Sequence, residues 1–267
     1  MSTPPSSGDR LLAASARLWF ATAMAGQWAF VWFILAYFGA RSVGGDWAAL
    51  NDKPHITGYV PGDSLGNAQW LLHVFVGAVV TVAGMLQLLP WLRRRWPALH
   101  RWNGRMFMLT AAVATLSGFW LTWVRGSQLN LPSAVSTSLN GALILVFAAL
   151  AWRSALRRQM AEHRRHAVRA YLLVNGVWFL RIGIVPVGAV MAATGHDMGY
   201  DSAAFLAVSV LSWVAPLACT ELYFAAEAAP RQRPKYLVAA VFVALALLTV
   251  VGGGAALMVM WLPAVAM

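Results

Sequence analysis

Polar side chains inside apolar segments are the residues of this sequence that can do chemistry. His73, Asn140 and Arg181 each lie within a different apolar stretch. A strongly polar side chain in hydrocarbon is costly, so it is retained where it faces protein, water or a ligand. At about 1.5 Å per helical residue, the three side chains lie at a similar depth, roughly 10 Å from one boundary. This spacing predicts a polar layer that binds a small amphiphilic ligand such as a quinone, whose carbonyl oxygens need hydrogen-bond donors.

The stretch that contains His73 carries small and polar residues on one face. His73, Gly77, Gly84 and Gln87 are spaced four, seven and three residues apart, which keeps them on a narrow face of a helix. Such a face points into a helix bundle, because small residues let helices approach closely. The pattern therefore adds Gln87 to the candidate ligand-binding residues. The alternative is a close-packing face on which His73 bonds a neighbouring carbonyl group.

Arg181 has no acidic residue at its own depth. Glu221 is the acidic residue well inside a span, and it lies about 13 Å away along the membrane normal by the helical rise. Arg181 therefore either extends toward the water at the nearer boundary or holds an anionic or carbonyl group of a ligand.

Three histidines near the other boundary suggest a second chemistry. His100 lies at the start of one apolar segment, and His163 and His166 precede another. Two imidazoles from different helices at equal depth can ligate a b-type haem, and neighbouring arginines can pair with its propionates. His100 with either His163 or His166 meets this requirement. The alternative is interfacial hydrogen bonding at the membrane edge.

Other catalytic and metal-binding patterns are absent from the sequence. It contains no GxGxxG, GxxxxGKS, HExxH or GxSxG motif, which argues against nucleotide binding, zinc proteolysis and serine hydrolysis. The histidines of the HRRH run are separated by arginines that would repel a cation, so we expect no metal site. The sequence leaves open whether the protein is an enzyme.

Apolar segments of membrane-spanning length must position these residues. The chain is 60% hydrophobic with a mean hydropathy of +0.63. Runs of about 20 apolar residues, enough to cross a bilayer as a helix, recur along it. We expect an all-α membrane bundle of about seven spans, with residues 1–14 as a short tail and residues 15–267 as one domain. The expected spans are Ser15–Ala40, Gln69–Pro90, Arg105–Val124, Ser138–Leu156, Val168–Ala193, Ala204–Ala226 and Tyr236–Trp261.

The distribution of Arg and Lys predicts the orientation of these spans. With a cytoplasmic N-terminus, about sixteen basic residues lie inside, whereas Arg41, Lys53 and Arg125 lie outside. The C-terminus is then periplasmic. The net charge of +11 is therefore a topology signal and argues against nucleic acid as a partner. We expect the lipid bilayer, and anionic head groups at the cytoplasmic face, to be the partners of the basic surface.

The order of these motifs resembles a known family. The pieces are HxxxG from His73, GxxQ ending at Gln87, LRRRxPxLHRxxGR from Leu92 to Arg105, HRRHxxRxY from His163, and the later pair Leu180–Arg181. Together, over about residues 69–224, they resemble the bacterial predicted membrane proteins of the domain of unknown function 2306. The resemblance implies an uncharacterised, multi-pass protein of the bacterial inner membrane and brings no established reaction or cofactor.

Three functions fit these observations. The first is binding of a small amphiphile such as a quinone by His73, Asn140, Arg181 and Gln87. The second is electron transfer by a b-type haem. The third is a non-enzymatic assembly or scaffold role, in which the polar face is packing and the basic segments bind lipid or a protein.

Overall fold

Helices make up every regular element in residues 5–51 and 58–266, the part of the chain that the computed structural model describes. Seven of them are long and apolar enough to cross a membrane, which confirms the predicted fold class. The elements are α1 (Ser7–Phe33), η1 (Ile34–Gly39), α2 (Ala40–Gly44), η2 (Ala48–Asn51), α3 (Ser64–Gln87), α4 (Pro90–Arg95), α5 (Pro97–Trp123), α6 (Leu131–Leu156), α7 (Met160–Val174), α8 (Gly176–Ala193), α9 (Ala203–Ala228), α10 (Gln232–Ala256), η3 (Leu257–Trp261) and α11 (Leu262–Ala266).

The first helix begins earlier than the apolar run that predicted it. Ser6 caps α1 by accepting a hydrogen bond from the backbone N–H of Asp9, and the Asp9 carboxylate accepts from the backbone N–H of Ser6. This reciprocal capping box satisfies two otherwise unpaired N–H groups. Residues 7–14 of the expected tail are therefore helical.

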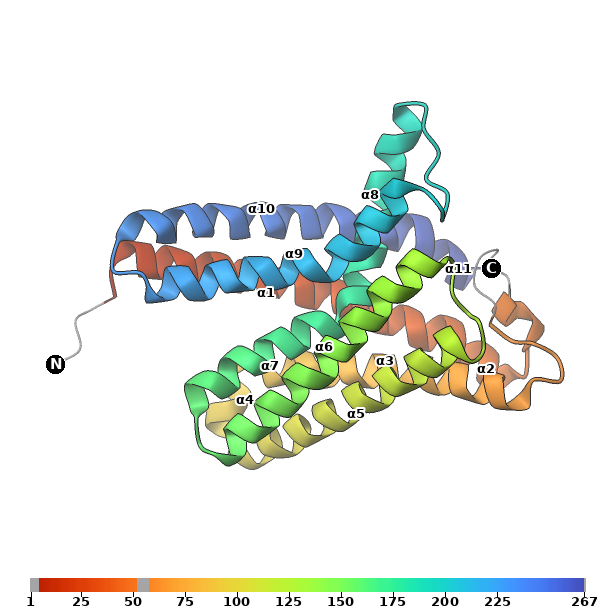
Figure 1. Cartoon of the computed structure of the whole chain (residues 1–267), viewed down its shortest axis with the longest axis horizontal. Helices are drawn as coiled ribbons and strands as arrows, with labels where there is room; N and C mark the ends of the chain where they lie inside the picture. The colour runs from red at the N-terminus through yellow and green to blue at the C-terminus, as the bar shows by residue number, and fades with distance from the viewer. Residues whose placement is uncertain (1–4, 52–57, 267) are drawn as a thin grey trace.

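The fifth span is two helices, whereas the sequence predicted one from Val168 to Ala193. The helix is interrupted at Asn175, whose Nδ2 donates to the Tyr171 carbonyl at 2.8 Å. Asn140 Nδ2 donates to the Leu173 carbonyl at 3.1 Å, so two amide side chains satisfy oxygens at the interruption. α7 packs against α6, whereas α8 packs against α9 and α10 and runs steeply across the other helices (Figure 1).

The helices form two groups, one of α1, α9 and α10 and one of α3, α5, α6 and α7 (Figure 1). The start of α1, α4, and the links α6–α7 and α9–α10 lie at one end of the molecule, at the left of the view. Residues 45–51, the link α5–α6 and the C-terminal helix lie at the opposite end. Most basic residues thus gather at one end, as the predicted orientation requires. Lys53 lies outside the described residues, and the compartment that each end faces stays a prediction.

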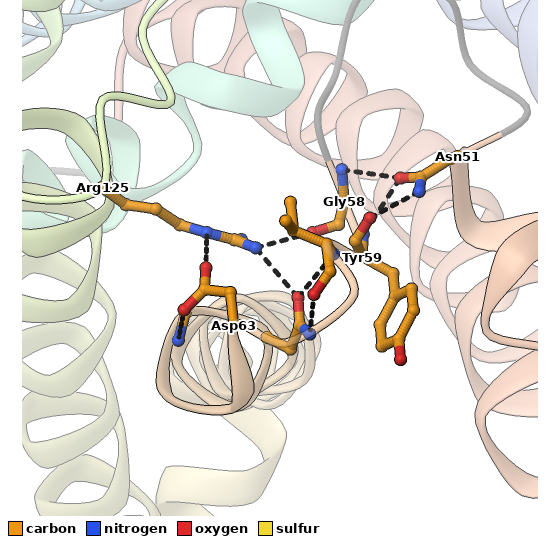
Figure 2. Close-up of polar contacts among 8 residues, drawn as sticks. Asn51, Gly58, Tyr59, Asp63 and Arg125 are labelled. Atoms are coloured by element: carbon orange, nitrogen blue, oxygen red, sulfur yellow. Dashed lines mark hydrogen bonds and ion pairs between the residues drawn. The ribbon is translucent and has the colours of Figure 1, made fainter.

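A hydrogen-bonded network, which we call the loop cap, joins the segment before α3 to the end of α5 (Figure 2). Arg125 Nε lies 3.0 Å from Asp63 Oδ2, and its Nη2 donates to the Gly58 carbonyl and to Asn67 Oδ1 at 3.0 and 2.9 Å. Asn51 Oδ1 accepts from the backbone N–H groups of Gly58 and Tyr59. The Arg125 side chain is 7% exposed, so the network fixes this loop as part of the fold.

Candidate functional site

A groove of about 310 Å³ lies where α1, α9 and α10 of one helix group meet α7 of the other. Residues of α1, α7, α8, α9 and α10 line it, together with Leu88 just after α3. We call it the interhelical groove. Its walls are mainly aliphatic and aromatic, and the aromatic side chains are Trp19, Phe20, Tyr171, Phe179, Tyr223, Phe224 and Phe242.

Gln27 of α1 supplies the amide in the lining of this groove, with 1% of its surface exposed. The Tyr171 hydroxyl of α7 donates to Gln27 Oε1 at 2.6 Å. This bond fixes the orientation of the amide, because Oε1 must face the hydroxyl. Among the described residues, none accepts a hydrogen bond from Gln27 Nε2. The amide therefore has two N–H donors available to a molecule in the groove.

Arginines mark the end of the groove nearest the basic surface. Arg164 of α7 pairs bidentately with Glu227 of α9 at 2.9–3.0 Å, so its charge is compensated. Arg17 of α1 is exposed and has no ion-pair partner among the residues that the structure describes. Arg17 and Gln27 are ten residues apart on one helix, or about 15 Å. The groove thus runs from a cationic opening, past aromatic walls, to a buried amide.

The structure brings two of the predicted ligand-binding residues together outside this groove. His73 Nδ1 lies 3.0 Å from Ser117 Oγ of α5. Arg181 Nη1 donates to the Val177 carbonyl at 3.1 Å, and its guanidinium lies 5.1 Å from the centre of the Phe30 ring. Arg181 is close enough to His73 to interact with it electrostatically. Glu221 pairs with Arg169 instead, at 2.6 Å.

The other two predicted ligand-binding residues bond to backbone carbonyl groups. Asn140 donates to Leu173 at the α7–α8 interruption, and Gln87 Nε2 donates to the His100 carbonyl at 2.7 Å. Within the described chain, no hydrogen bond links either amide to His73 or Arg181. These bonds give Asn140 and Gln87 a packing role, and ligand binding by them stays a prediction.

The three candidate haem ligands lie near the basic end, beside the start of α5 and along α7. His163 Nδ1 lies 2.9 Å from the Ala151 carbonyl, and no hydrogen bond from the described chain reaches its Nε2. His100 is close enough to His163 to interact electrostatically, and its Nδ1 is buried without a hydrogen-bond partner among the described residues. His166 stacks on Phe147. Haem ligation by His100 and His163 stays a prediction, and neither residue lines the interhelical groove.

Sequence reasoning missed Gln27 and Tyr171. Gln27 is an amide in the middle of the first apolar run, which is the type of residue that marks a functional site in a membrane span. That signal was present in the sequence. Its pairing with Tyr171 was not, because the two residues are 144 positions apart and the bond forms only where the two helices approach each other in the folded chain.

Comparison with known proteins supplies the family. Residues 70–224 match the family model described as Predicted membrane protein (DUF2306). No curated protein and no solved structure matches the chain. The matched segment begins in α3 and ends in α9, so it includes the α7 and α9 walls of the groove, whereas α1 and α10 lie outside it. Because the match covers more than half of the chain and carries the motifs singled out in the sequence, the chain belongs to the DUF2306 family of predicted membrane proteins.

Proposed function

We propose that this membrane protein binds a small amphiphilic molecule of the quinone type in the interhelical groove. The observation that carries the proposal is the Gln27 amide, which is buried, is oriented by Tyr171 and has no acceptor for Nε2 in the described part of the chain. Gln27 lines the groove, so a ligand carbonyl oxygen there can accept a hydrogen bond from Nε2, and a hydrogen bond of this kind contributes about 0.5–1.5 kcal/mol.

The dimensions and lining of the groove support this class of ligand. Its volume of about 310 Å³ is at the lower end of the range that small-molecule sites occupy, roughly 300–1,000 Å³. The aromatic walls can stack on a planar ring, and an isoprenoid tail can leave along the apolar lining. A carbonyl group at Gln27 then fixes the ring in one orientation, which is how a few polar groups give specificity in an apolar site.

Analysis of what co-purifies with the protein tests the proposal. The full chain is purified in mild detergent, extracted with organic solvent, and the extract is analysed by mass spectrometry and for a quinone absorption band. Gln27→Leu should lose the bound quinone. Gln87→Leu removes the same amide outside the groove and should retain it. Equal retention by both variants would exclude the groove, and loss in Gln87→Leu alone would favour the residues predicted from the sequence.

The neighbouring pair of His73 and Arg181 supports a second position for the ligand. Arg181 bonds one backbone carbonyl and faces an aromatic ring, and its guanidinium has no acidic partner among the described residues. If the Arg181→Ala variant retains as much ligand as the wild type, the ligand does not bind at this second position.

The alternative of a b-type haem rests on the proximity of His100 and His163. A haem held there would supply one-electron transfer, and His163 would be oriented by the Ala151 carbonyl. Protein from haem-replete cells then shows a Soret band that His163→Ala abolishes. If the purified protein is colourless and no quinone co-purifies with it, both ligand hypotheses are excluded and the scaffold role remains.

We also propose that the protein lies in the inner membrane of a bacterium with its basic end in the cytoplasm. The gathering of the arginine-rich links at one end of the molecule supports this orientation. A phosphatase fused to the C-terminus should be active, because that enzyme needs the oxidising periplasm. If the C-terminal fusion is inactive and a fusion to the N-terminus is active, the orientation is the opposite of the proposed one.

A further inference from the structure

The link between α3 and α5 is basic without any acidic residue of its own. We call residues 90–105, which comprise α4 and the first turns of α5, the first elbow. It carries Arg93, Arg94, Arg95, Arg101 and Arg105, and no Asp or Glu occurs from Leu88 to Asn130. In the described part of the chain, none of these arginines forms an ion pair. Their charge is therefore left for something outside the protein.

His100 lies near two of these arginines. Arg93 of α4, Arg101 of α5 and His163 of α7 are all close enough to act electrostatically on its ring. Its Nδ1 is buried and has no hydrogen-bond partner among the residues described. Two arginines from neighbouring helices therefore lie near His100, and the Nδ1 atom of its ring is an unused donor or acceptor. An anion with several oxygens fits such a cluster.

Tryptophans place the cluster at the depth of lipid head groups. Trp91 and Trp96 pack edge to face at 5.1 Å, and both remain about half exposed, at 56% and 48%. Trp102 is 64% exposed, and the guanidinium of Arg105 lies 4.9 Å from the centre of its ring. Exposed tryptophans beside arginines are typical of the boundary between hydrocarbon and head groups.

In the link between α6 and α7, by contrast, acidic residues compensate part of the basic charge. We call residues 153–169 the second elbow. Its Arg164 pairs with Glu227 and its Arg169 pairs with Glu221, both on α9. Some of its arginines thus hold α7 to α9, whereas no acid of the described chain engages the first elbow. The two elbows are similar in sequence composition, but only the second forms ion pairs with acidic residues of the described chain.

We propose that the first elbow is a binding site for the phosphate of an anionic phospholipid. Arg93 and Arg101 hold the phosphate oxygens, His100 adds a hydrogen bond through Nδ1, and Trp91 and Trp96 lie against the upper acyl chain. The tryptophans select a lipid over a soluble phosphate, because they give binding energy only to a molecule with an apolar part. The site lies next to Leu88, a lining residue of the interhelical groove, but does not depend on a ligand in that groove.

Native mass spectrometry of the full chain in detergent tests this site. The protein is titrated with phosphatidylglycerol or with phosphatidylcholine, and retained lipid is counted. The double variant Arg93→Gln/Arg101→Gln is compared with Arg153→Gln/Arg157→Gln, which removes the same charge from exposed positions of the second elbow. At about 1 kcal/mol per basic residue, the first variant should bind phosphatidylglycerol about 30-fold more weakly. The control should stay within about twofold of the wild type, and the wild type should prefer phosphatidylglycerol.

Three results would overturn the proposal. Equal weakening in both double variants would show a dependence on net charge alone. Equal retention of the two lipids by the wild type would remove the requirement for an anion. Displacement of the lipid by excess inorganic phosphate would show that the occupant is a soluble anion. If the double variant does not elute as a folded species, Arg93→Gln alone should still weaken binding about fivefold.

Discussion

The loop cap and the interhelical groove are both built from polar side chains that join distant parts of the chain, yet they use their hydrogen bonds differently. In the loop cap, Arg125 donates to Asp63, Gly58 and Asn67, and only its Nη1 has no partner among the described residues. In the groove, Gln27 accepts one bond from Tyr171 and donates none to the described chain. The cap directs most of its donors to the fold, whereas the groove keeps its amide donor free.

This difference separates residues that stabilise the fold from residues that bind a ligand. A buried polar group with its partners in place lowers the free energy of the native state, and its removal leaves those partners unpaired. A donor that faces the groove without a partner in the described chain does not stabilise the fold in this way. We therefore expect substitutions in the cap to reduce stability and substitutions around Gln27 to change ligand content.

The largest effect should follow from Arg125→Ala. The substitution removes an ion pair and two further hydrogen bonds from a side chain that is 7% exposed, and it leaves the Asp63 carboxylate without its cation. We expect a loss of about 3 kcal/mol in the free energy of unfolding, measured by denaturation in detergent. An unchanged unfolding midpoint would show that the loop cap does not stabilise the fold, and the proposed difference between the cap and the groove would be wrong.

A smaller loss should follow from Asp63→Ala. Asp63 caps α3 by accepting from the Gly66 N–H at 2.8 Å and also pairs with Arg125. Loss of an N-cap costs about 1 kcal/mol, and loss of the ion pair adds to it. Asp63→Asn retains the cap without the charge, so the difference between the two variants, read from thermal unfolding, separates the two contributions. Equal destabilisation by Ala and Asn would assign the effect to the ion pair alone.

Tyr171→Phe should cost about 1 kcal/mol, because hydrogen bonds between membrane helices contribute roughly 0.6–1.7 kcal/mol. The variant also frees the Gln27 amide to rotate, so its quinone content should fall. Adding Gln27→Leu replaces both partners with apolar groups and should restore much of the stability without restoring the ligand. A double-mutant cycle by thermal unfolding measures this coupling. Additive losses in the cycle would contradict a direct bond between the two side chains.

The smallest effect on stability is expected for Arg17→Gln. Arg17 is exposed and has no ion pair in the described part of the chain, so the unfolding free energy should change by less than about 0.5 kcal/mol. A neutral quinone needs no cation, so its retention in the extract should also be unchanged. Loss of the ligand in this variant would indicate an anionic amphiphile and would change the class of ligand assigned to the groove.

The spans could be predicted from the sequence because each depends on a local apolar length. The interruption at Asn175 could not, since Val168 to Ala193 reads as one apolar run, and what ends α7 there includes a hydrogen bond from Asn140 on another helix. Helical depth predicted a shared level for His73 and Arg181, and it could not say that their helices are neighbours; ligand binding by the two stays a prediction. The groove depends on how α1 meets α7, which no local pattern encodes.

The interruption at Asn175 also has a consequence for how the protein enters the membrane. α8 has 18 residues of high hydropathy, whereas α7 has 15 residues that include Arg164, Arg165 and Arg169. An insertion machinery that recognises apolar length would accept α8 as the fifth crossing and leave α7 at the interface. We therefore expect α7 to take its place against α6 after insertion, as a late step in assembly that completes the groove.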